Sequence, residues 1–191
     1  FWKAEDDLQL YESDVNEMTR FLIDEYGDSD EISVGHTVMT FDIEVEMNSG
    51  LPDIENASNA ITSIAGHDSI TNDYFVYVVN KGEKIDKTIK GAKVESFDTE
   101  EGLLSAFMTK WREINPTIVT GWNIDYFDVT YLYNRYKLLF GQQFANQLSP
   151  IGKVSYNKYR SRYIIAGVSC LDYLALYKCY NFTELPNYRL D

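Results

Sequence analysis

The sequence predicts a mixed α/β domain in which three neighbouring antiparallel strands come first and helices then alternate with strands. Residues 37–79 contain three β-rich runs that are separated by turn-forming residues. Residues 99–140 contain two apolar stripes of helical spacing on either side of a short apolar run. A short run of this kind is typical of a buried strand, so the second half should alternate helix and strand.

The first strand is predicted at residues 37–46, where apolar and polar side chains alternate. Its apolar face is formed by Met39, Phe41, Ile43 and Val45. Two further β-rich runs, at 60–66 and 74–79, are joined by the turn-forming residues 68–73. We therefore expect these strands to be antiparallel neighbours.

The first helix of the alternating part is predicted at residues 99–114 from its apolar stripe. Asp98 and Glu101 have the spacing of a capping box at its start, and Pro116 ends it. An apolar strand at 117–122 follows. This segment therefore supplies one helix and the strand that brings the chain back to the sheet.

A second helix is predicted at residues 128–140, with Gly141 as its C-cap. Beyond it we expect a β-hairpin within 153–166, a strand at 167–171 and a short helix at 173–180. The order β-β-β-α-β-α is that of ribonuclease H-like mixed sheets with flanking helices, and several other α+β folds share it.

Composition and charge divide the chain into two parts. With 191 residues and 45% hydrophobic content, the chain can bury one sizeable core. Residues 1–35 carry 11 acidic and two basic residues, so most of the net charge of −13 lies there. We predict that 1–35 is an acidic segment or linker with a helix near 15–26, and that 36–191 is the main domain.

The bulk properties exclude several classes of protein. The acidic balance argues against binding of duplex DNA through a broad basic face. No apolar run approaches the roughly 18 residues of a membrane span, and a signal-peptide pattern is absent, so we expect a soluble cytoplasmic protein with no membrane contact. Cys170 and Cys179 are interpreted as buried free thiols, and His36 and His67 as packing or surface residues.

Asp42 and Glu44 are the first candidates for chemistry. Two residues apart on a strand, their carboxylates leave the same face about 7 Å apart, within reach of a shared divalent cation. An acidic protein produces Asp-x-Glu by chance, as at 53–55 and 98–100, but only the first pair has a strand behind it. The alternative is that Asp42 and Glu44 are the solvated face of an edge strand.

A third carboxylate follows the predicted strand at 117–122. This strand delivers Asn123, and Asp128 then lies in the first turn of a helix, at the carboxyl end of a strand where open α/β sheets build their sites. The alternative role of Asp128 is a helix N-cap, and Asp125 would serve that role equally well.

Two motifs resemble those of a known family. Residues 41–44, Phe-Asp-Ile-Glu, resemble the first exonuclease motif of family B DNA polymerases, and residues 123–128 resemble the second, Asn-x-x-x-Phe-Asp. Other stretches are similar to polymerases of T-even-type bacteriophages in particular: 120–123, 133–135, 148–150, 171–173 and 176–178. The resemblance extends from Val38 to Asp191.

The resemblance implies the 3'→5' proofreading exonuclease domain of a replicative polymerase, with a ribonuclease H-like fold and two Mg²⁺ or Mn²⁺ ions. It implies that Asp42 bridges both metals, that Glu44 holds one and orients the attacking water, and that Asp128 completes the second site. Asn123 and Phe127 would bind the substrate. The implied partners are single-stranded DNA 3' ends, the polymerase domain of the same chain, a replication clamp and accessory proteins, in the host cytoplasm if the source is a phage.

The family has a third motif, Tyr-x-x-x-Asp, which this sequence lacks. The Tyr26 to Asp30 match lies upstream of the first motif, and Tyr188 to Asp191 has one residue too few, so Tyr188 and Asp191 are interpreted as structural. The chain begins with Phe1 and stops directly after a polar run, so we expect both ends to lie within a longer protein. We expect the third motif beyond Asp191, and weak metal binding and activity without it.

The predicted hairpin carries a basic and aromatic patch. Basic side chains attract phosphates and rings stack on unpaired bases, so the patch suits a single-stranded primer end. The residues predicted to bind substrate are Tyr156, Lys158, Tyr159, Arg160 and Arg162, beside Lys153 and Tyr163. The hairpin of phage family B polymerases, which helps to separate the primer strand, is in the corresponding place. The alternative is a solvated hairpin with cross-strand pairs.

Asp172 and two rival functions complete the predictions. Asp172 opens a helix after a strand, which predicts an N-cap. One rival function is a DNA-binding or scaffolding module that performs no hydrolysis. The other is an unrelated ribonuclease H-like nuclease that cleaves RNA or branched DNA.

Overall fold

The structure is a computed structural model that describes residues 15–31, 34–47, 50–82, 84–181 and 185–189. The chain divides into two compact units, Phe1–Gly35 and His36–Asp191. In the described part of the first unit, α1 (Glu17–Tyr26) is capped by Asn16, whose side chain accepts a hydrogen bond from the Met18 N–H at 2.8 Å. None of the residues of α1 is buried. Its exposed apolar side chains are Met18, Phe21, Leu22, Ile23 and Tyr26.

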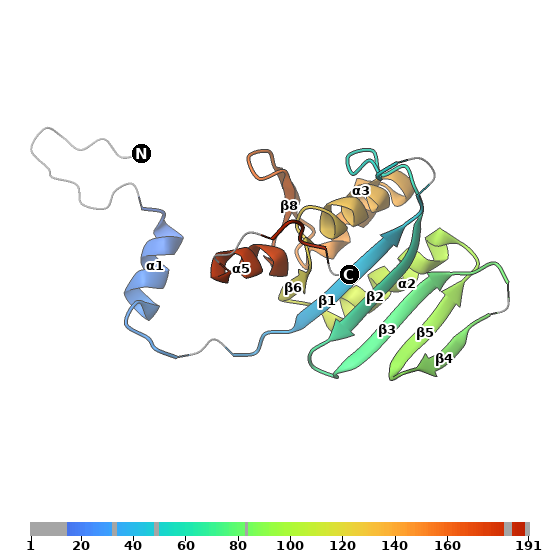
Figure 1. The fold of residues 1–191 in the computed structure, drawn as a ribbon. Coiled ribbons are helices and arrows are strands. Elements are labelled where there is room, and N and C mark those ends of the chain that lie inside the picture. The colour runs from blue at the N-terminus through green and yellow to red at the C-terminus, as the bar shows by residue number, and fades with distance from the viewer. Residues whose placement is uncertain (1–14, 32–33, 48–49, 83, 182–184, 190–191) are drawn as a thin grey trace, which may run out of the picture. The chain divides into compact units, whose positions relative to one another are not determined.

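The second unit is built on a mixed sheet of seven strands within its described residues (Figure 1). The strands are β1 (Val38–Val45), β2 (Ile61–Asp68), β3 (Asp73–Val79), β4 (Asp86–Ile89), β5 (Ala92–Phe97), β6 (Ile118–Gly121) and β9 (Ser169–Asp172). They lie in the order β4-β5-β3-β2-β1-β6-β9. The first three strands are antiparallel neighbours, as predicted, and β6 and β9 extend the sheet in parallel beside β1.

Strands β4 and β5 were not predicted. Residues 81–93 carry a lysine at every third position, and every residue of β4 is exposed, so this stretch has no apolar alternation. These two strands form through pairing with other strands: β5 joins β3 in parallel, and β4 forms a hairpin with β5.

Three helices of the second unit follow the predicted positions, and two short helices at 142–145 and 146–148 were not predicted. They are α2 (Glu100–Ile114), α3 (Asp128–Phe140), α4 (Gln142–Ala145), η1 (Asn146–Leu148) and α5 (Tyr173–Tyr180). The predicted hairpin is present as β7 (Val154–Asn157) paired with β8 (Arg162–Ile165). Gly141 ends α3 with a φ of 85°, a left-handed value that favours glycine. Within the described residues, every helix is too short or too polar to cross a membrane.

The predicted capping box at the start of α2 is wrong by one residue. Thr99 is the N-cap, and its hydroxyl accepts a hydrogen bond from the Gly102 N–H at 3.1 Å. Asp98 lies one residue earlier and is exposed. Thr and Asp are both good N-caps, so the sequence pattern could not choose between these neighbours.

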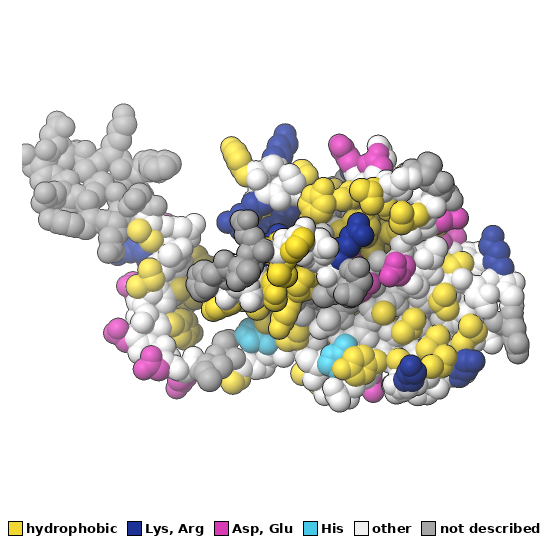
Figure 2. All heavy atoms as spheres, viewed as in Figure 1, with side chains coloured by type: hydrophobic (Ala, Val, Ile, Leu, Met, Phe, Trp, Pro, Cys, Tyr) yellow, Lys and Arg dark blue, Asp and Glu magenta, His cyan; other side chains and the backbone are white. Residues whose placement is uncertain are grey.

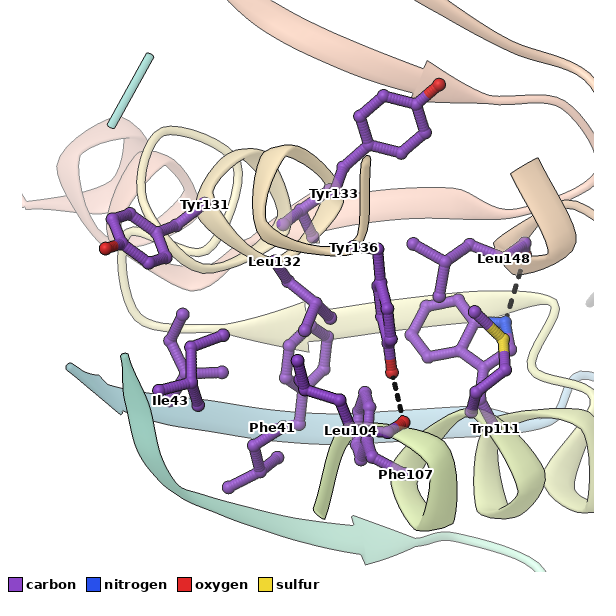
Figure 3. Close-up of a cluster of buried hydrophobic side chains, with 14 of the residues drawn as sticks. Phe41, Ile43, Leu104, Phe107, Trp111, Tyr131, Leu132, Tyr133, Tyr136 and Leu148 are labelled. Atoms are coloured by element: carbon purple, nitrogen blue, oxygen red, sulfur yellow. Dashed lines mark hydrogen bonds between the residues drawn. The ribbon is translucent and has the colours of Figure 1, made fainter. Parts of the chain in front are cut away.

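Helices α2 and α3 pack on one face of the sheet and form the core (Figure 3). Phe41 of β1 contacts Phe107 and Trp111 of α2, with ring centroids 5.6 Å and 5.9 Å away. Two buried polar groups are satisfied inside this core: the Tyr136 hydroxyl donates to the Leu104 carbonyl at 2.8 Å, and the Trp111 indole N–H donates to the Leu148 carbonyl at 3.0 Å. Because the apolar face of β1 is buried here, its polar residues must face the other way.

A buried ion pair joins α2, α3 and the connection between β1 and β2. Glu100 accepts from the Arg135 guanidinium at 2.6 Å and 2.8 Å, and it also accepts from the Ile61 N–H at 2.7 Å. Arg135 donates to the carbonyls of Ala57 and Ser58 as well. A buried charge is tolerated only when it is paired and hydrogen-bonded, as both are here.

Arg135→Met is expected to lower the free energy of unfolding by about 3 to 5 kcal/mol, because the Glu100 carboxylate would stay buried without its cation. Urea denaturation followed by circular dichroism measures the change. The control is Lys93→Met: Lys93 pairs with Glu95 at 2.7 Å but its side chain is 62% exposed, so little stability should be lost. Similar losses in both variants would contradict the importance of burial.

Candidate active site

Strand β1 places Asp42 and Glu44 on the exposed face of the sheet, opposite Phe41 and Ile43. In the register with β2, Asp42 lies across from Ala65 and Glu44 across from Ser63. The alternative that these carboxylates belong to an edge strand is wrong, because β1 lies between β2 and β6 in the interior of the sheet.

Asp128 reaches β1 at the peptide between these two carboxylates. Its Oδ1 accepts a hydrogen bond from the Ile43 N–H at 3.0 Å, and the side chain is buried. The contact is possible because the parallel pairing of β1 with β6 covers only Val38, Met39 and Thr40, so the strands have separated before Ile43. The carboxylate thus supplies an acceptor where a neighbouring strand would otherwise have one.

Gly121, the last residue of β6, permits this arrangement. A Cβ atom at this position would lie 2.7 Å from the backbone oxygen of Phe41 and 3.1 Å from the Ile124 side chain. Only glycine therefore lets the chain leave the sheet this close to β1 and turn into the loop that leads to α3.

Burial, with a smaller contribution from neighbouring negative charges, raises the pKa of two carboxyl groups at this point of the sheet. Burial raises the pKa of Asp128 to about 7 in spite of the hydrogen bond from Ile43, and the negative charges of Asp42 and Asp172 add to the effect. Burial and the charge of Glu44 also raise the pKa of Asp42. A cation bound among these carboxylates would relieve this repulsion.

The carboxylates are of the right chemical type to bind a divalent cation, but they are not grouped closely enough to hold one ion together. Carboxylate oxygens are the ligands that Mg²⁺ and Mn²⁺ prefer. In the part of the chain that the structure describes, however, no three His, Cys, Asp or Glu side chains are grouped so that they could hold one ion. The predicted ligands Asp42, Glu44 and Asp128 are brought to one segment of β1, and their role as metal ligands stays a prediction.

The loop between β6 and α3 adopts an unusual backbone. Asn123 has a φ of 60°, in the left-handed region that few residues other than glycine adopt. The N-cap position of α3 is Phe127, which makes no capping bond with its side chain, so the alternative N-cap roles of Asp125 and Asp128 are both wrong. The ring of Phe127 stacks on Tyr131 with centroids 5.6 Å apart.

Asp125 forms an ion pair with Arg162, at the start of β8, through a direct contact between Oδ2 and Nη1. Asp125 Oδ1 and Arg162 Nε are buried and make no hydrogen bond among the described residues. The pair connects the loop after β6 to the base of the hairpin. Arg162 is therefore engaged by the protein itself, and its predicted contact with DNA stays a prediction.

The tip of the hairpin is free of the sheet. Tyr156, Lys158, Tyr159 and Arg160 are exposed, and basic and hydrophobic side chains stand next to one another there (Figure 2). At the base, by contrast, the Tyr163 hydroxyl donates to Asn134 Oδ1 of α3 at 2.7 Å. The structure thus separates the predicted patch into an anchored base and an exposed tip, and both the DNA-binding and the solvated interpretation remain open for the tip.

Asp172 is an N-cap of α5, as predicted, because it accepts from the Leu174 N–H at 2.9 Å. A second contact of Asp172 was not predicted: it also accepts hydrogen bonds from the backbone of the loop after β6. A contact between residues 47 or 49 positions apart leaves no periodic signal in a sequence, although the acidic residue at the end of β9 could have suggested one.

Three smaller predictions can also be compared with the structure. Both cysteines are free, but only Cys170 is partly buried, where burial raises the pKa of its thiol to about 12, and Cys179 is exposed, so the prediction of two buried thiols is wrong for Cys179. His67 packs on the Tyr74 ring, with centroids 4.3 Å apart. Tyr188 contributes a carbonyl that accepts from the Trp122 indole at 2.7 Å, in keeping with a structural role, whereas Asp191 lies outside the described residues.

Comparison with known proteins identifies the family. Residues 26–191 match the family model of the DNA polymerase family B exonuclease domain. The chain belongs to this family. The resemblance seen in its two motifs is thereby confirmed, and so is the predicted fold class.

This family B exonuclease domain has relatives among phage and animal polymerases. It is 37% identical to the DNA-directed DNA polymerase of Escherichia phage RB69 over 84% of this chain, and 35% identical to that of Enterobacteria phage T4 over 81%. A shorter match, over 27% of the chain, is 47% identical to the DNA polymerase delta catalytic subunit of Bos taurus. The two phage matches cover 21% and 20% of those polymerases, so the chain spans about a fifth of their length.

Asp128→Asn is expected to make the metal-free protein more stable at pH 8 and to leave its stability unchanged near pH 4. Because the pKa of Asp128 is raised to about 7, the folded state binds a proton that the unfolded state has lost between pH 4 and 7. Stability of the native sequence therefore falls as pH rises through this window, by about 4 kcal/mol at most, and Asn keeps an oxygen acceptor for Ile43.

Urea denaturation in a chelating buffer at pH 4, 6 and 8 measures this effect. The control Asp86→Asn removes an exposed carboxylate of β4 and keeps Asp128, so its stability should fall with rising pH as that of the native sequence does. A difference between Asp128→Asn and the native sequence that stays constant from pH 4 to 8 would contradict the raised pKa.

Proposed function

We propose that this chain is a 3'→5' exonuclease domain that removes nucleotides one at a time from single-stranded or mispaired DNA ends, within a larger family B replicative polymerase. The observation that carries the proposal is the position of Asp128. In a member of the family B exonuclease domains, it binds the peptide N–H between Asp42 and Glu44, so three carboxylates meet at one segment of β1.

The carboxylates would hold the metals and the loop would hold the DNA end. Asp42, Glu44 and Asp128 are the residues proposed to bind two Mg²⁺ or Mn²⁺ ions. Bound there, such ions supply an activated water and stabilise the charge on the phosphate and on the leaving oxygen. The chain's own residues fix the geometry: the hydrogen bond from Ile43 orients the Asp128 carboxylate, and the raised pKa of Asp128 falls once a cation is present.

Substrate contacts are proposed for two regions. Asn123 and Phe127 lie in the loop that leads to Asp128 and would position the 3'-terminal nucleotide. Exposed rings and cations at the hairpin tip would hold the unpaired strand that enters the site, because aromatic stacking and phosphate contacts together bind single strands without sequence preference. These tip residues are Tyr156, Lys158, Tyr159 and Arg160, with Arg162 at the base.

The wider context is proposed from the relatives, which are DNA-directed DNA polymerases of two phages. The domain would act with a polymerase domain of the same chain, with a replication clamp and with accessory proteins, in the cytoplasm of a bacterial host. A single-stranded end delivered from the polymerase domain would be its substrate.

Asp42→Ala is expected to reduce exonuclease activity by about 100-fold or more, since a lost metal ligand removes several kcal/mol of transition-state stabilisation. The measurement is digestion of a 5'-labelled single-stranded DNA oligonucleotide in Mn²⁺, with this chain and with the longer polymerase that the proposal implies. The native sequence should produce a ladder of single-nucleotide steps from the 3' end.

Asp98→Ala is the matched control for this assay, because Asp98 is exposed and belongs to another Asp-x-Glu pair, at the start of a helix. It should digest DNA like the native sequence. Absence of a ladder in the longer polymerase would exclude the exonuclease, and preferred cleavage of RNA or branched DNA would favour an unrelated nuclease.

The second candidate function is a DNA-binding module that performs no hydrolysis, and the lack of a grouped three-residue metal site among the described residues favours it. Its test is the hairpin tip. The double variant Lys158→Ala, Arg160→Ala is expected to weaken binding of single-stranded DNA and to reduce the slope of log K against log salt by about 1.4, at about 0.7 for each phosphate contact.

The control for this test is Lys84→Ala, Lys87→Ala, which removes the same charge from exposed positions at the opposite edge of the sheet. Equal weakening in both double variants would indicate a general charge effect and would contradict a specific role of the hairpin tip. Binding that needs no metal, together with the absence of a ladder, would favour the module that only binds DNA.

A further inference from the structure

One carboxylate in the second unit accepts more hydrogen bonds than its capping role requires. Asp172 Oδ1 accepts from the backbone N–H groups of Leu174 at 2.9 Å, Ala175 at 3.4 Å and Asn123 at 3.1 Å. Its Oδ2 accepts from the Asp125 N–H at 3.3 Å. The first two bonds cap α5, but the other two bind a loop that is remote in the sequence.

The place of Asp172 in the sheet explains how one side chain reaches both segments. It is the last residue of β9, and in the parallel register it lies across from Gly121, the last residue of β6. Both strands end at this edge of the sheet, where β9 continues into α5 and β6 continues into the loop toward α3. The carboxylate lies where these two segments diverge and accepts hydrogen bonds from backbone N–H groups of each.

The contact with the loop lies at a left-handed point of its backbone. Asn123 has a left-handed φ of 60°, a conformation that Asn adopts more readily than other residues with a side chain but that still costs more than the right-handed one unless the surroundings favour it. The Asp172 carboxylate accepts from the N–H groups on either side of Ile124 and so stabilises this conformation. Charge-assisted bonds of this kind are stronger than bonds between neutral groups.

The hold on Asn123 and Asp125 continues to Asp128 through short local bonds. The Asn123 carbonyl accepts from the Phe127 N–H at 3.1 Å, and the Asp125 carbonyl accepts from the Thr130 hydroxyl at 2.9 Å. The start of α3 is thus tied to the loop on both sides of Asp128. Movement of the loop would shift the carboxylate that binds between Asp42 and Glu44.

The hydrogen bonds of Asp172 all go to backbone N–H groups. Oδ1 accepts from three backbone N–H groups and Oδ2 accepts from one, so both carboxylate oxygens are bonded to the protein backbone. Asp172 therefore acts on the loop through the backbone that it holds, and its charge acts separately by adding to the raised pKa of Asp128. An ordinary N-cap, which uses one oxygen for the first turn of its own helix, has no such reach.

We propose that Asp172 is a positioning residue for the 3' exonuclease: its carboxylate holds the Asn123 to Asp125 loop in its left-handed conformation and thereby fixes Asn123 and Asp128 against β1. The role in the reaction rests on the proposed function. The hold on the loop does not, and it can be measured separately.

Asp172→Ser separates the hold on the loop from the capping of α5. Serine is a good N-cap and can still accept from the first turn of α5, but its single hydroxyl cannot also bind the Asn123 and Asp125 N–H groups. Thr99→Ala is the control for loss of a cap alone, because Thr99 caps α2 through one side-chain bond to Gly102, and no hydrogen bond joins it to the loop among the described residues.

Amide hydrogen exchange, followed residue by residue by NMR, is the first readout. In Asp172→Ser, exchange at Asn123 and Asp125 should accelerate about 10-fold, the effect of losing one net hydrogen bond, whereas Leu174 should change little. In Thr99→Ala, Asn123 and Asp125 should exchange as in the native sequence. Unchanged exchange at Asn123 and Asp125 in Asp172→Ser would overturn the proposal.

Exonuclease kinetics are the second readout. Asp172→Ser should lower kcat about 10- to 100-fold, the usual range for partners that orient metal-binding groups, with a smaller change in KM and an unfolding midpoint close to that of the native sequence. Thr99→Ala should keep the native kcat. Native kcat in Asp172→Ser would overturn the role of Asp172 in the reaction. A native protein that degrades no DNA would overturn that role as well, because the proposed function itself would then be wrong. Accelerated exchange in Asp172→Ser would in that case still show that Asp172 holds the loop.

Discussion

The hydrogen bond between the Ile43 N–H and the Asp128 carboxylate is the contact on which the site depends. It joins the first residue of α3 to the strand that carries Asp42 and Glu44, at the place where β1 and β6 have parted. Burial alone would favour a neutral Asp128, and the hydrogen bond opposes that tendency in part. Asp128 therefore joins two elements of the fold and also has a raised pKa, which a bound cation would lower.

Helix α3 is also hydrogen-bonded to the hairpin and to the connection between β1 and β2. Asn134 accepts from Tyr163 of the hairpin and donates to the Ile54 carbonyl of the β1–β2 connection at 2.9 Å. The Tyr131 hydroxyl bonds to both the N–H and the carbonyl of Asn59 in that connection. A rigid helix core thus supports the segments on either side of β1, which is how sites with accurate geometry are usually built.

The sequence was sufficient where the pattern is local. Alternation along β1 predicted which face carries Asp42 and Glu44, and apolar stripes predicted α2 and α3. It was insufficient where a long-range partner decides the outcome. All residues of strand β4 are exposed and the strand forms by pairing with β5, so its sequence has no apolar alternation from which it could be predicted. The Asp125 contact with Arg162 likewise joins residues 37 positions apart, and helix capping was the nearer explanation for Asp125.

The buried Glu100–Arg135 pair implies that ionic strength affects the fold and the proposed substrate contacts differently. Salt ions screen charges in contact with water, and a pair whose side chains are each 9% exposed lies largely beyond their reach. Binding of a nucleic-acid strand, by contrast, weakens steeply as salt rises, because displaced counterions no longer gain as much entropy. A concentrated salt solution should therefore release DNA from a domain that keeps its native structure, and binding could be reversed without unfolding.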